Sequence, residues 1–194
     1  MTSGGHVLLV CTGNVCRSPF AERVLAHQLD QLGIPPDRRV RLASAGTAAL
    51  VGESMDPRCA AHVRSAGGTA ENFRARQLTA DMVADADLVL TATREHRAAV
   101  ARLHPRSLGY AFALRDFAVL VGDLPRPWRP HDGPASTVAG RTAAQAAARR
   151  GLSPPLPVGE ADIVDPFGRP EAVVAAMTRQ VLDALRPILR VLAT

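Results

Sequence analysis

The sequence predicts an α/β protein: a single three-layer domain in which helices cover both faces of a central four-stranded parallel sheet. Three observations lead to this fold class. Short apolar runs of strand type alternate along the chain with longer segments of helical periodicity. The length of 194 residues suits one domain. Hydrophobic residues make up 47% of the chain and charged residues 21%, which is enough apolar material for a core.

The first strand and the helix after it are the best-defined elements. His6–Cys11 is an apolar run rich in Val and Leu between glycines and small polar residues, which is typical of a buried strand. A helix is expected at Ser18–Leu32, with Ser18 as its N-cap, Pro19 at the first helical position and Gly33 at its end. A short loop is therefore predicted to join the strand to the helix.

The remaining elements follow the same alternation. Pro187 is expected to bend the last helix, because proline cannot donate a helical hydrogen bond. We expect strands at Val40–Ala45, Asp87–Ala92 and Leu108–Phe112, and helices at Asp56–Ser65, Arg94–Leu103, Arg115–Val121 and Pro170–Leu192.

One stretch, Gly122–Glu160, does not fit this alternation. It holds 7 of the 15 prolines of the chain and an Ala-rich segment of helical character near Thr137–Arg150. We interpret it as a long insertion or mobile flap on the surface of one domain that spans residues 1–194.

The charge of the chain is weak evidence for a nucleic-acid partner. The net charge is +5, and every basic residue is Arg. The absence of Lys together with the heavy use of Ala indicates codon bias. The arginines are scattered, and an aromatic content of 4% is too low for a surface that stacks bases. We therefore expect no nucleic acid among the partners.

The terminus, the cysteines and the histidines predict a cytoplasmic protein without a metal. No apolar run approaches the ~20 residues of a membrane span, and the N-terminus lacks the basic region of a secretory signal. Three cysteines, with Cys11 and Cys16 close together, do not suit a secreted disulfide framework. The six histidines show no metal-ligand spacing.

The segment that follows the first strand carries the chemistry. A cysteine ends the strand, small residues follow and a helix begins, so backbone N–H groups and a positive helix end meet at one point. Such a loop binds a tetrahedral oxyanion and is expected to lower the pKa of Cys11, while Arg17 can donate two hydrogen bonds to phosphate. A buried structural cysteine beside a surface arginine is the alternative. The expected phosphate-binding residues are Thr12, Gly13, Asn14, Val15, Cys16 and Arg17.

At this loop the chain resembles the low-molecular-weight protein tyrosine phosphatases. Val10–Glu22 is similar to the phosphate-binding loop and first helix of that family, and Ser44–Thr47 and Asp165–Phe167 are similar to its later motifs. The resemblance covers the chain apart from Gly122–Glu160. It implies a phosphatase that acts on phosphorylated proteins, needs no cofactor, and is a monomer or weak dimer.

The resemblance also implies roles for individual residues. Cys11 is the nucleophile that forms a phosphocysteine intermediate, and Arg17 with the loop amides stabilises the transition state. Asp165 protonates the leaving oxygen and then activates water. Ser18 donates a hydrogen bond to the Cys11 sulfur, and Asn14 holds the loop because Asn tolerates a left-handed backbone.

The chain has two Asp-Pro pairs, so the acid must be chosen between them. Asp56 precedes Pro57 and a helical run, which an N-cap explains fully. Asp165 precedes Pro166 and Phe167 before the last helix begins, and Pro166 disfavours a helical conformation at Asp165. An extended Asp beside an aromatic ring suits an acid that faces an aryl leaving group.

Four positions bear on the substrate. Leu50 lies near the place where many family members have a Trp or Tyr wall, and Phe73 stands where many have a His that supports the loop. Leu50 and Phe167 are expected to line the substrate cleft, unless the insertion supplies the missing wall. Phosphoarginine phosphatases of the family carry Thr where this chain has Val15, whose apolar side chain favours an aryl substrate. The alternative from another class, a module that binds phosphate without turnover, would not need an acid such as Asp165.

The other cysteines leave two interpretations open. Cys16 either forms a reversible disulfide with Cys11 that protects the nucleophile, or fills the underside of the loop with a small side chain. Cys59 is expected to be a buried helix residue.

Overall fold

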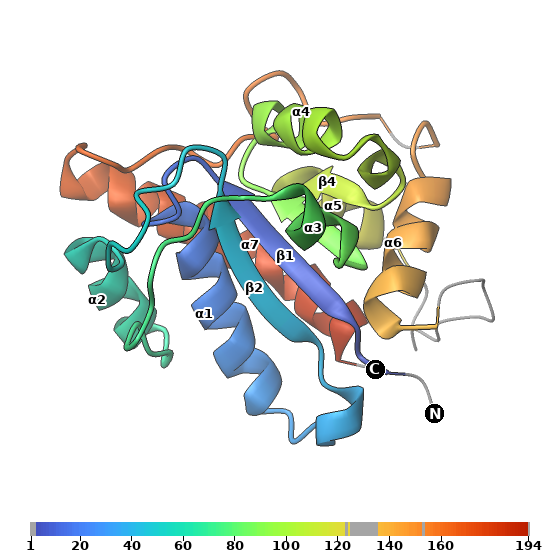
Figure 1. Cartoon of the computed structure of the whole chain (residues 1–194), viewed down its shortest axis with the longest axis horizontal. Coiled ribbons are helices and arrows are strands. Elements are labelled where there is room, and N and C mark those ends of the chain that lie inside the picture. The colour runs from blue at the N-terminus through green and yellow to red at the C-terminus, as the bar shows by residue number, and fades with distance from the viewer. Residues whose placement is uncertain (1–2, 123, 125–135, 153, 194) are drawn as a thin grey trace.

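A four-stranded parallel sheet forms the centre of the computed structural model, which describes residues 3–122, 124, 136–152 and 154–193 (Figure 1). The strand order is β2-β1-β3-β4. In the register, Val10 of β1 pairs with Ala45 of β2 and Thr91 of β3. The predicted fold class is confirmed. The strands are β1 His6–Cys11, β2 Arg41–Gly46, β3 Leu88–Thr91 and β4 Ala111–Ala113.

Helices cover both faces of this sheet because the side chains of each strand alternate between them. Val7 and Leu9 of β1 belong to the larger apolar cluster with α1, α5 and α7, whereas Leu8 and Val10 belong to the smaller cluster with α3 and α4. The helices are α1 Arg17–Asp30, α2 Pro57–Ser65, α3 Ala80–Ala84, α4 Arg94–Leu103, α5 Leu114–Gly122, α6 Val138–Ala148 and α7 Glu171–Leu192, with 3-10 turns at Pro36–Arg38 and Pro105–Gly109.

Most predicted elements agree with the structure to within two residues, and one strand differs by more. The fourth strand is Ala111–Ala113, three residues beyond the start of the predicted Leu108–Phe112, because Pro105–Gly109 forms a 3-10 turn. Helix α3 was not predicted, since its five residues are too few to show helical periodicity. Pro187 lies inside α7, which continues through it.

The first helix begins one residue earlier than predicted. Cys16 occupies the N-cap position and makes no side-chain capping hydrogen bond, so Arg17 is the first helical residue. The expected N-cap role of Ser18 is therefore wrong, and its hydroxyl group is used elsewhere. By contrast, Asp56 caps α2 as predicted, accepting hydrogen bonds from the amides of Arg58 and Cys59.

Part of the insertion packs onto the core instead of forming a loose flap. Helix α6 lies where the Ala-rich segment predicted a helix, and its Ala139, Ala143 and Ala146 are buried in the larger cluster. The amide of Ala139 donates to the Gly4 carbonyl at 3.1 Å, and Thr137 caps the helix. Residues 123, 125–135 and 153 of the insertion lie outside the described residues.

The described residues contain neither a membrane-spanning helix nor a cluster of metal ligands. None of their helices is both long and apolar enough to cross a membrane. No group of three or more His, Cys, Asp or Glu side chains in the same part of the chain is arranged to hold a metal ion.

Candidate active site

The loop after β1 has the conformation that the sequence predicts. Asn14 has a φ of 55°, in the left-handed region that Asn tolerates. Its buried side chain donates to the hydroxyl groups of Ser18 at 3.0 Å and Ser44 at 2.9 Å, and accepts from the Arg76 amide at 2.9 Å. Three hydrogen bonds thus fix the loop from below. Phe73 takes no part in them, since it is buried under the Arg23 guanidinium instead.

Cys11 lies at the base of this loop, at the carboxyl end of β1. Its Sγ is 3.0 Å from the Ser18 Oγ, within hydrogen-bonding distance. Because Ser18 belongs to the first turn of α1, the helix positions the hydroxyl group directly beside the sulfur.

The pKa of Cys11 differs from the prediction. Burial raises the pKa of the thiol, while the Ser18 hydroxyl, the Ser18 amide and the Arg17 charge act in the opposite direction. The expectation of a lowered pKa is therefore wrong for this structure. The sequence shows the donors that stabilise a thiolate, but it does not show the desolvation that a fully buried sulfur undergoes.

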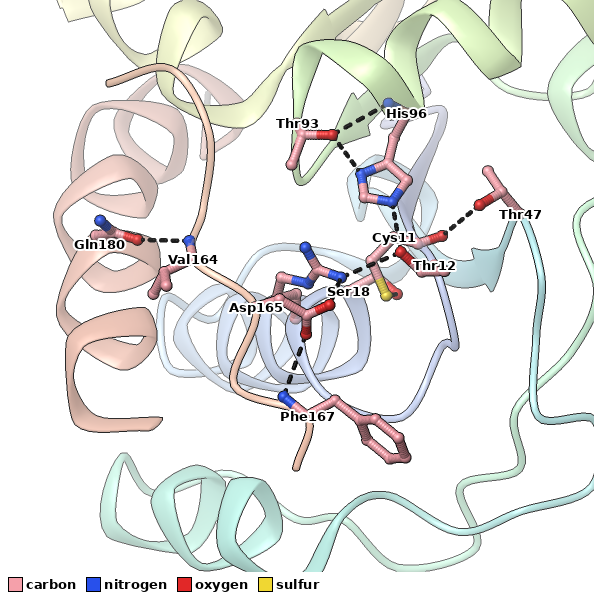
Figure 2. Close-up of polar contacts among 11 residues, drawn as sticks. Cys11, Thr12, Ser18, Thr47, Thr93, His96, Val164, Asp165, Phe167 and Gln180 are labelled. Atoms are coloured by element: carbon pink, nitrogen blue, oxygen red, sulfur yellow. Dashed lines mark hydrogen bonds and ion pairs between the residues drawn. The ribbon is translucent and has the colours of Figure 1, made fainter. Parts of the chain in front are cut away.

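Arg17 and Asp165 form an ion pair above the loop (Figure 2). The Arg17 Nη2 is 2.8 Å from the Asp165 Oδ2 and also donates to the Thr12 hydroxyl at 3.2 Å. The Arg17 side chain is only 7% exposed and that of Asp165 is 52% exposed, so the carboxylate lies at the mouth of the site. Figure 2 shows Phe167 beyond Asp165, with its amide on the second carboxylate oxygen at 3.2 Å.

Three hydrogen bonds hold the segment that carries Asp165. The Val164 amide donates to Gln180 of α7 at 2.9 Å, as Figure 2 shows. The Ile163 amide donates to the Ala92 carbonyl at 2.8 Å, and Asp162 accepts from the Arg94 amide at 2.8 Å. Asp165 is therefore brought to the loop by contacts with α7 and with the start of α4.

A cavity of about 170 Å³ opens over Cys11. Leu50 and Phe167 form its exposed apolar walls. Among the described residues, none from the insertion lines this cavity. The described part of the insertion therefore gives no support to the expectation that the insertion supplies the missing wall. The lining residues are Cys11, Thr12, Gly13, Val15, Cys16, Arg17, Ala48, Leu50, Asp165 and Phe167.

A contact between His96 and this loop is not predicted by any pattern in the sequence. The His96 Nε2 lies 2.8 Å from the Thr12 hydroxyl, and its Nδ1 lies 2.7 Å from the hydroxyl of Thr93, the N-cap of α4 (Figure 2). His96 is 8% exposed, and burial followed by the charge of Arg17 lowers its pKa. The spacing of Thr93 and His96 is a local capping signal, but only the folded sheet brings them to Thr12.

The His96 contact makes stability depend on pH. Because the folded pKa lies below the ordinary value of 6.5, the unfolded chain binds the proton more readily, and stability falls as the pH decreases from about 6.5. Substituting His96→Gln should remove the contribution of His96 to the pH dependence of stability. Near pH 7 the loss of the Thr12 contact should also lower the free energy of unfolding by about 1–3 kcal/mol. Urea unfolding of both proteins between pH 5 and pH 8 measures the difference. Parallel stability profiles would contradict the assignment.

A second unpredicted network lies under the loop. Ser44 donates to the Glu22 carboxylate, and the Arg76 Nε donates to the Ser44 carbonyl at 2.7 Å. These residues connect α1 and β2 to the segment 73–78. Their side chains are far apart in the sequence, so no local pattern could have paired them.

All three cysteines are free thiols in the structure. Interaction with the neighbouring Cys59 thiol, together with burial, raises the pKa of Cys16. Cys59 is a fully buried residue of α2, as predicted. The arrangement agrees with the interpretation of Cys16 as a side chain that fills the underside of the loop. A disulfide between Cys11 and Cys16 stays a prediction.

The fold and the site define a class of protein. A cysteine and an arginine on one anion-binding loop, faced by an aspartate, are the groups required for phosphoryl transfer through a cysteine. Residues 6–132 match the family model described as low molecular weight phosphotyrosine protein phosphatase. The chain belongs to this family, whose enzymes are hydrolases of phosphoric monoesters. Asp165 lies outside the matched residues.

Individual relatives agree with this assignment. The chain is 40% identical to the probable low molecular weight protein-tyrosine-phosphatase AmsI of Erwinia amylovora over 103 residues, 53% of this chain and 66% of that protein. It is 36% identical to Wzb of Salmonella typhi over 129 residues, 63% of this chain and 76% of that protein. The alignment thus covers about two thirds of AmsI.

Solved structures show the same fold. The crystal structure of AmsI matches with a TM-score of 0.61 and 25% identity, covering 95% of this chain and 92% of that one. The YwlE arginine phosphatase from Geobacillus stearothermophilus matches with a TM-score of 0.64 and 23% identity, covering 95% and 90% of the two chains.

Proposed function

We propose that this protein hydrolyses phosphotyrosine in phosphorylated proteins through a phosphocysteine intermediate on Cys11. The observation that carries the proposal is the convergence of Cys11, Arg17 and Asp165 on one cavity of about 170 Å³. Cys11 ends β1, Arg17 begins α1 and Asp165 lies before α7, and each has the chemistry that one step of the reaction needs. A module that only bound phosphate would have no use for the aspartate.

Arg17 and the loop amides are suited to hold the phosphate group. The Arg17 Nε is buried and has no hydrogen-bond partner among the described residues, so it is available to a phosphate oxygen. Its Nη2 donates to Asp165, and a bound phosphate dianion replaces that carboxylate as the acceptor. The start of α1 adds its positive end to the same point.

The reaction then proceeds in two displacements. The Cys11 thiolate attacks phosphorus, an S–P bond forms, and the P–O bond to the tyrosine breaks as protonated Asp165 gives its proton to the leaving phenolate oxygen. In the second step Asp165 takes a proton from water, which attacks phosphorus and breaks the S–P bond. The products are inorganic phosphate and the Cys11 thiolate, and Asp165 is protonated again.

Ser18 is suited to support the sulfur in both displacements. Its hydroxyl lies 3.0 Å from the Cys11 Sγ and favours the thiolate over the thiol. Replacing Ser18→Ala should therefore raise the pKa of Cys11 further and slow turnover about 10–100-fold, the effect of losing one hydrogen bond to a charged group. The pH dependence of Cys11 alkylation by iodoacetate measures the first effect. An unchanged alkylation profile would show that Ser18 does not donate to the sulfur.

The cavity walls favour an aryl group. Leu50 and Phe167 are apolar and 43% and 57% exposed at the mouth, and Val15 adds an apolar side chain to the lining. These side chains offer contact to a phenyl ring and no acceptor for the charged guanidinium of phosphoarginine. We therefore rank a phosphoarginine phosphatase second.

A comparison of phosphopeptides tests the proposal. Peptides of one sequence carrying phosphotyrosine, phosphoarginine or phosphoserine are incubated with the full chain in reducing buffer with excess chelator, and released phosphate is measured. We expect phosphotyrosine to be the preferred substrate by kcat/KM. Preference for phosphoarginine would select the second-ranked activity, and binding of all three without phosphate release would replace the enzyme with a binding module.

A further inference from the structure

A second and larger cavity, of about 330 Å³, lies away from Cys11. Its walls come from α4, β4, α5 and, near the end of the insertion, Arg150, Gly151, Pro154, Pro155 and Leu156. Figure 1 shows α4, β4, α5 and α6 gathered on one side of the molecule. The volume falls within the ~300–1,000 Å³ range of small-molecule sites. Residues 150–156 lie beyond the part of the chain that matches the family model, so the insertion builds this wall.

Arginine side chains dominate the polar part of this cavity. Arg94, Arg97 and Arg150 line it together with a single carboxylate, Asp116. Both oxygens of Asp116 accept from Arg94, each at 2.8 Å. Both Asp116 oxygens are therefore paired with Arg94, and the net positive charge of the lining comes from Arg97 and Arg150.

These two guanidinium groups meet on one backbone oxygen. The Arg97 Nε donates to the Ala111 carbonyl at 2.8 Å, and the Arg150 Nη2 donates to the same oxygen at 2.7 Å. Among the described residues, neither arginine forms an ion pair with a carboxylate. Burial and the neighbouring charge of Arg97 lower the pKa of Arg150 to about 10. Two like charges thus stand side by side, and the nearby Asp116 charge, which raises the pKa of Arg150, offsets only part of the opposing effects.

The rest of the cavity is apolar. Phe112 lies under the Arg150 guanidinium, 3.9 Å from it to the ring centroid, and fixes the orientation of that group. Val119, Leu120 and Leu156 supply aliphatic surface. A charged pair at one end and apolar walls around it match a ligand that carries one anionic group on an apolar body.

We propose that this cavity is a second ligand site that binds a small organic anion, with its carboxylate or phosphate group on Arg97 and Arg150. The anion adds negative charge beside a pair that has no ion-pair partner among the described residues, and guanidinium N–H groups are strong donors to carboxylate and phosphate oxygens. The apolar body of the ligand lies against Val119 and Leu156. The site is independent of turnover at Cys11.

Calorimetric titration of the full chain with naphthalene-2-carboxylate tests this site, with naphthalene-2-carboxamide as the neutral isostere. We expect saturable one-to-one binding of the carboxylate and at least tenfold weaker binding of the amide. Replacing Arg97→Gln should weaken the carboxylate at least tenfold. Arg102→Gln is the matched control, because Arg102 is an exposed arginine on the same helix. Filling the cavity with Val119→Trp should abolish binding, which keeps the test valid if Arg97→Gln fails to fold.

A further variant separates this site from the one at Cys11. Arg17→Ala removes the arginine of the phosphate-binding loop, and carboxylate binding should survive it. Loss of binding in Arg17→Ala would place the anion in the Cys11 loop and overturn the proposal. Equal affinity for the acid and the amide, equal effects of Arg97→Gln and Arg102→Gln, or no saturable binding would overturn it as well. None of these measurements depends on phosphatase activity, so the two proposals fail separately.

Discussion

Replacing Cys11→Ser should reduce turnover of an aryl phosphate by more than about 10⁴-fold, the scale on which loss of a covalent nucleophile acts. A serine hydroxyl is a neutral, weak nucleophile near pH 7, and the side chain within hydrogen-bonding distance of position 11 is the Ser18 hydroxyl, which is not a base. The hydrogen-bond donors of the loop and Arg17 remain. The variant should therefore still bind inorganic phosphate, as measured by competition or calorimetry, while its phosphate release from p-nitrophenyl phosphate disappears.

The matched control for this substitution is Cys59→Ala. Cys59 is a buried free thiol in α2 that does not line the cavity over Cys11. Its removal should lower stability through a small cavity and leave kcat of the folded protein close to that of the wild type. Residual activity of a few per cent in Cys11→Ser, measured with excess chelator, would assign the nucleophile to another group.

The second large effect is expected for Asp165→Asn, and it should depend on the leaving group. General acid catalysis contributes about 10²–10⁴-fold. That full loss is expected with phenyl phosphate, whose phenolate is a poor leaving group, and a much smaller loss with p-nitrophenyl phosphate. A plot of kcat against leaving-group pKa should become steep in the variant. Because Asn cannot form the ion pair with Arg17, inorganic phosphate should also inhibit the variant at lower concentration.

Asp56→Asn provides the control, since it changes the other Asp-Pro pair in the same way. The amide oxygen of Asn can still cap α2, so turnover should stay near the wild-type value. If Asp165→Asn slowed good and poor leaving groups equally, Asp165 would act by positioning Arg17 and not by proton transfer.

The residues predicted for the site lie together because most of them are local in sequence. One strand, one loop and one helix turn place Cys11, Asn14, Arg17 and Ser18, and each of these elements has a strong pattern of its own. Asp165 is distant in sequence, but the Pro after it marks an extended residue at the end of a loop. The apolar runs of the strands and their alternation with helices likewise predicted a four-stranded parallel sheet, whereas the strand order came only from the structure.

What the sequence could not predict depends on contacts through space. Thr12 meets His96, and Cys16 meets Cys59, only after β3, α2 and α4 have packed around the loop. The role of Ser18 was misassigned in part because a Ser-Pro pair at a helix start matches the N-cap pattern. The pKa of Cys11 was misjudged because burial is a property of the folded chain. The second cavity depends on its lining residues near the end of the insertion, whose packing has no periodic signal.

Because Arg17 is paired with Asp165, an incoming anion must compete with that carboxylate for the Arg17 guanidinium. A tethered carboxylate competes with every incoming ligand at a fixed, high local concentration. A singly charged anion offers Arg17 no more than the carboxylate that it would displace. A phosphate dianion carries a second negative charge, and its additional oxygens can accept hydrogen bonds from the loop amides. Both properties favour its binding over that of the carboxylate. We therefore expect the site to discriminate by ligand charge before any chemistry begins, with monovalent anions inhibiting more weakly than a phosphate dianion.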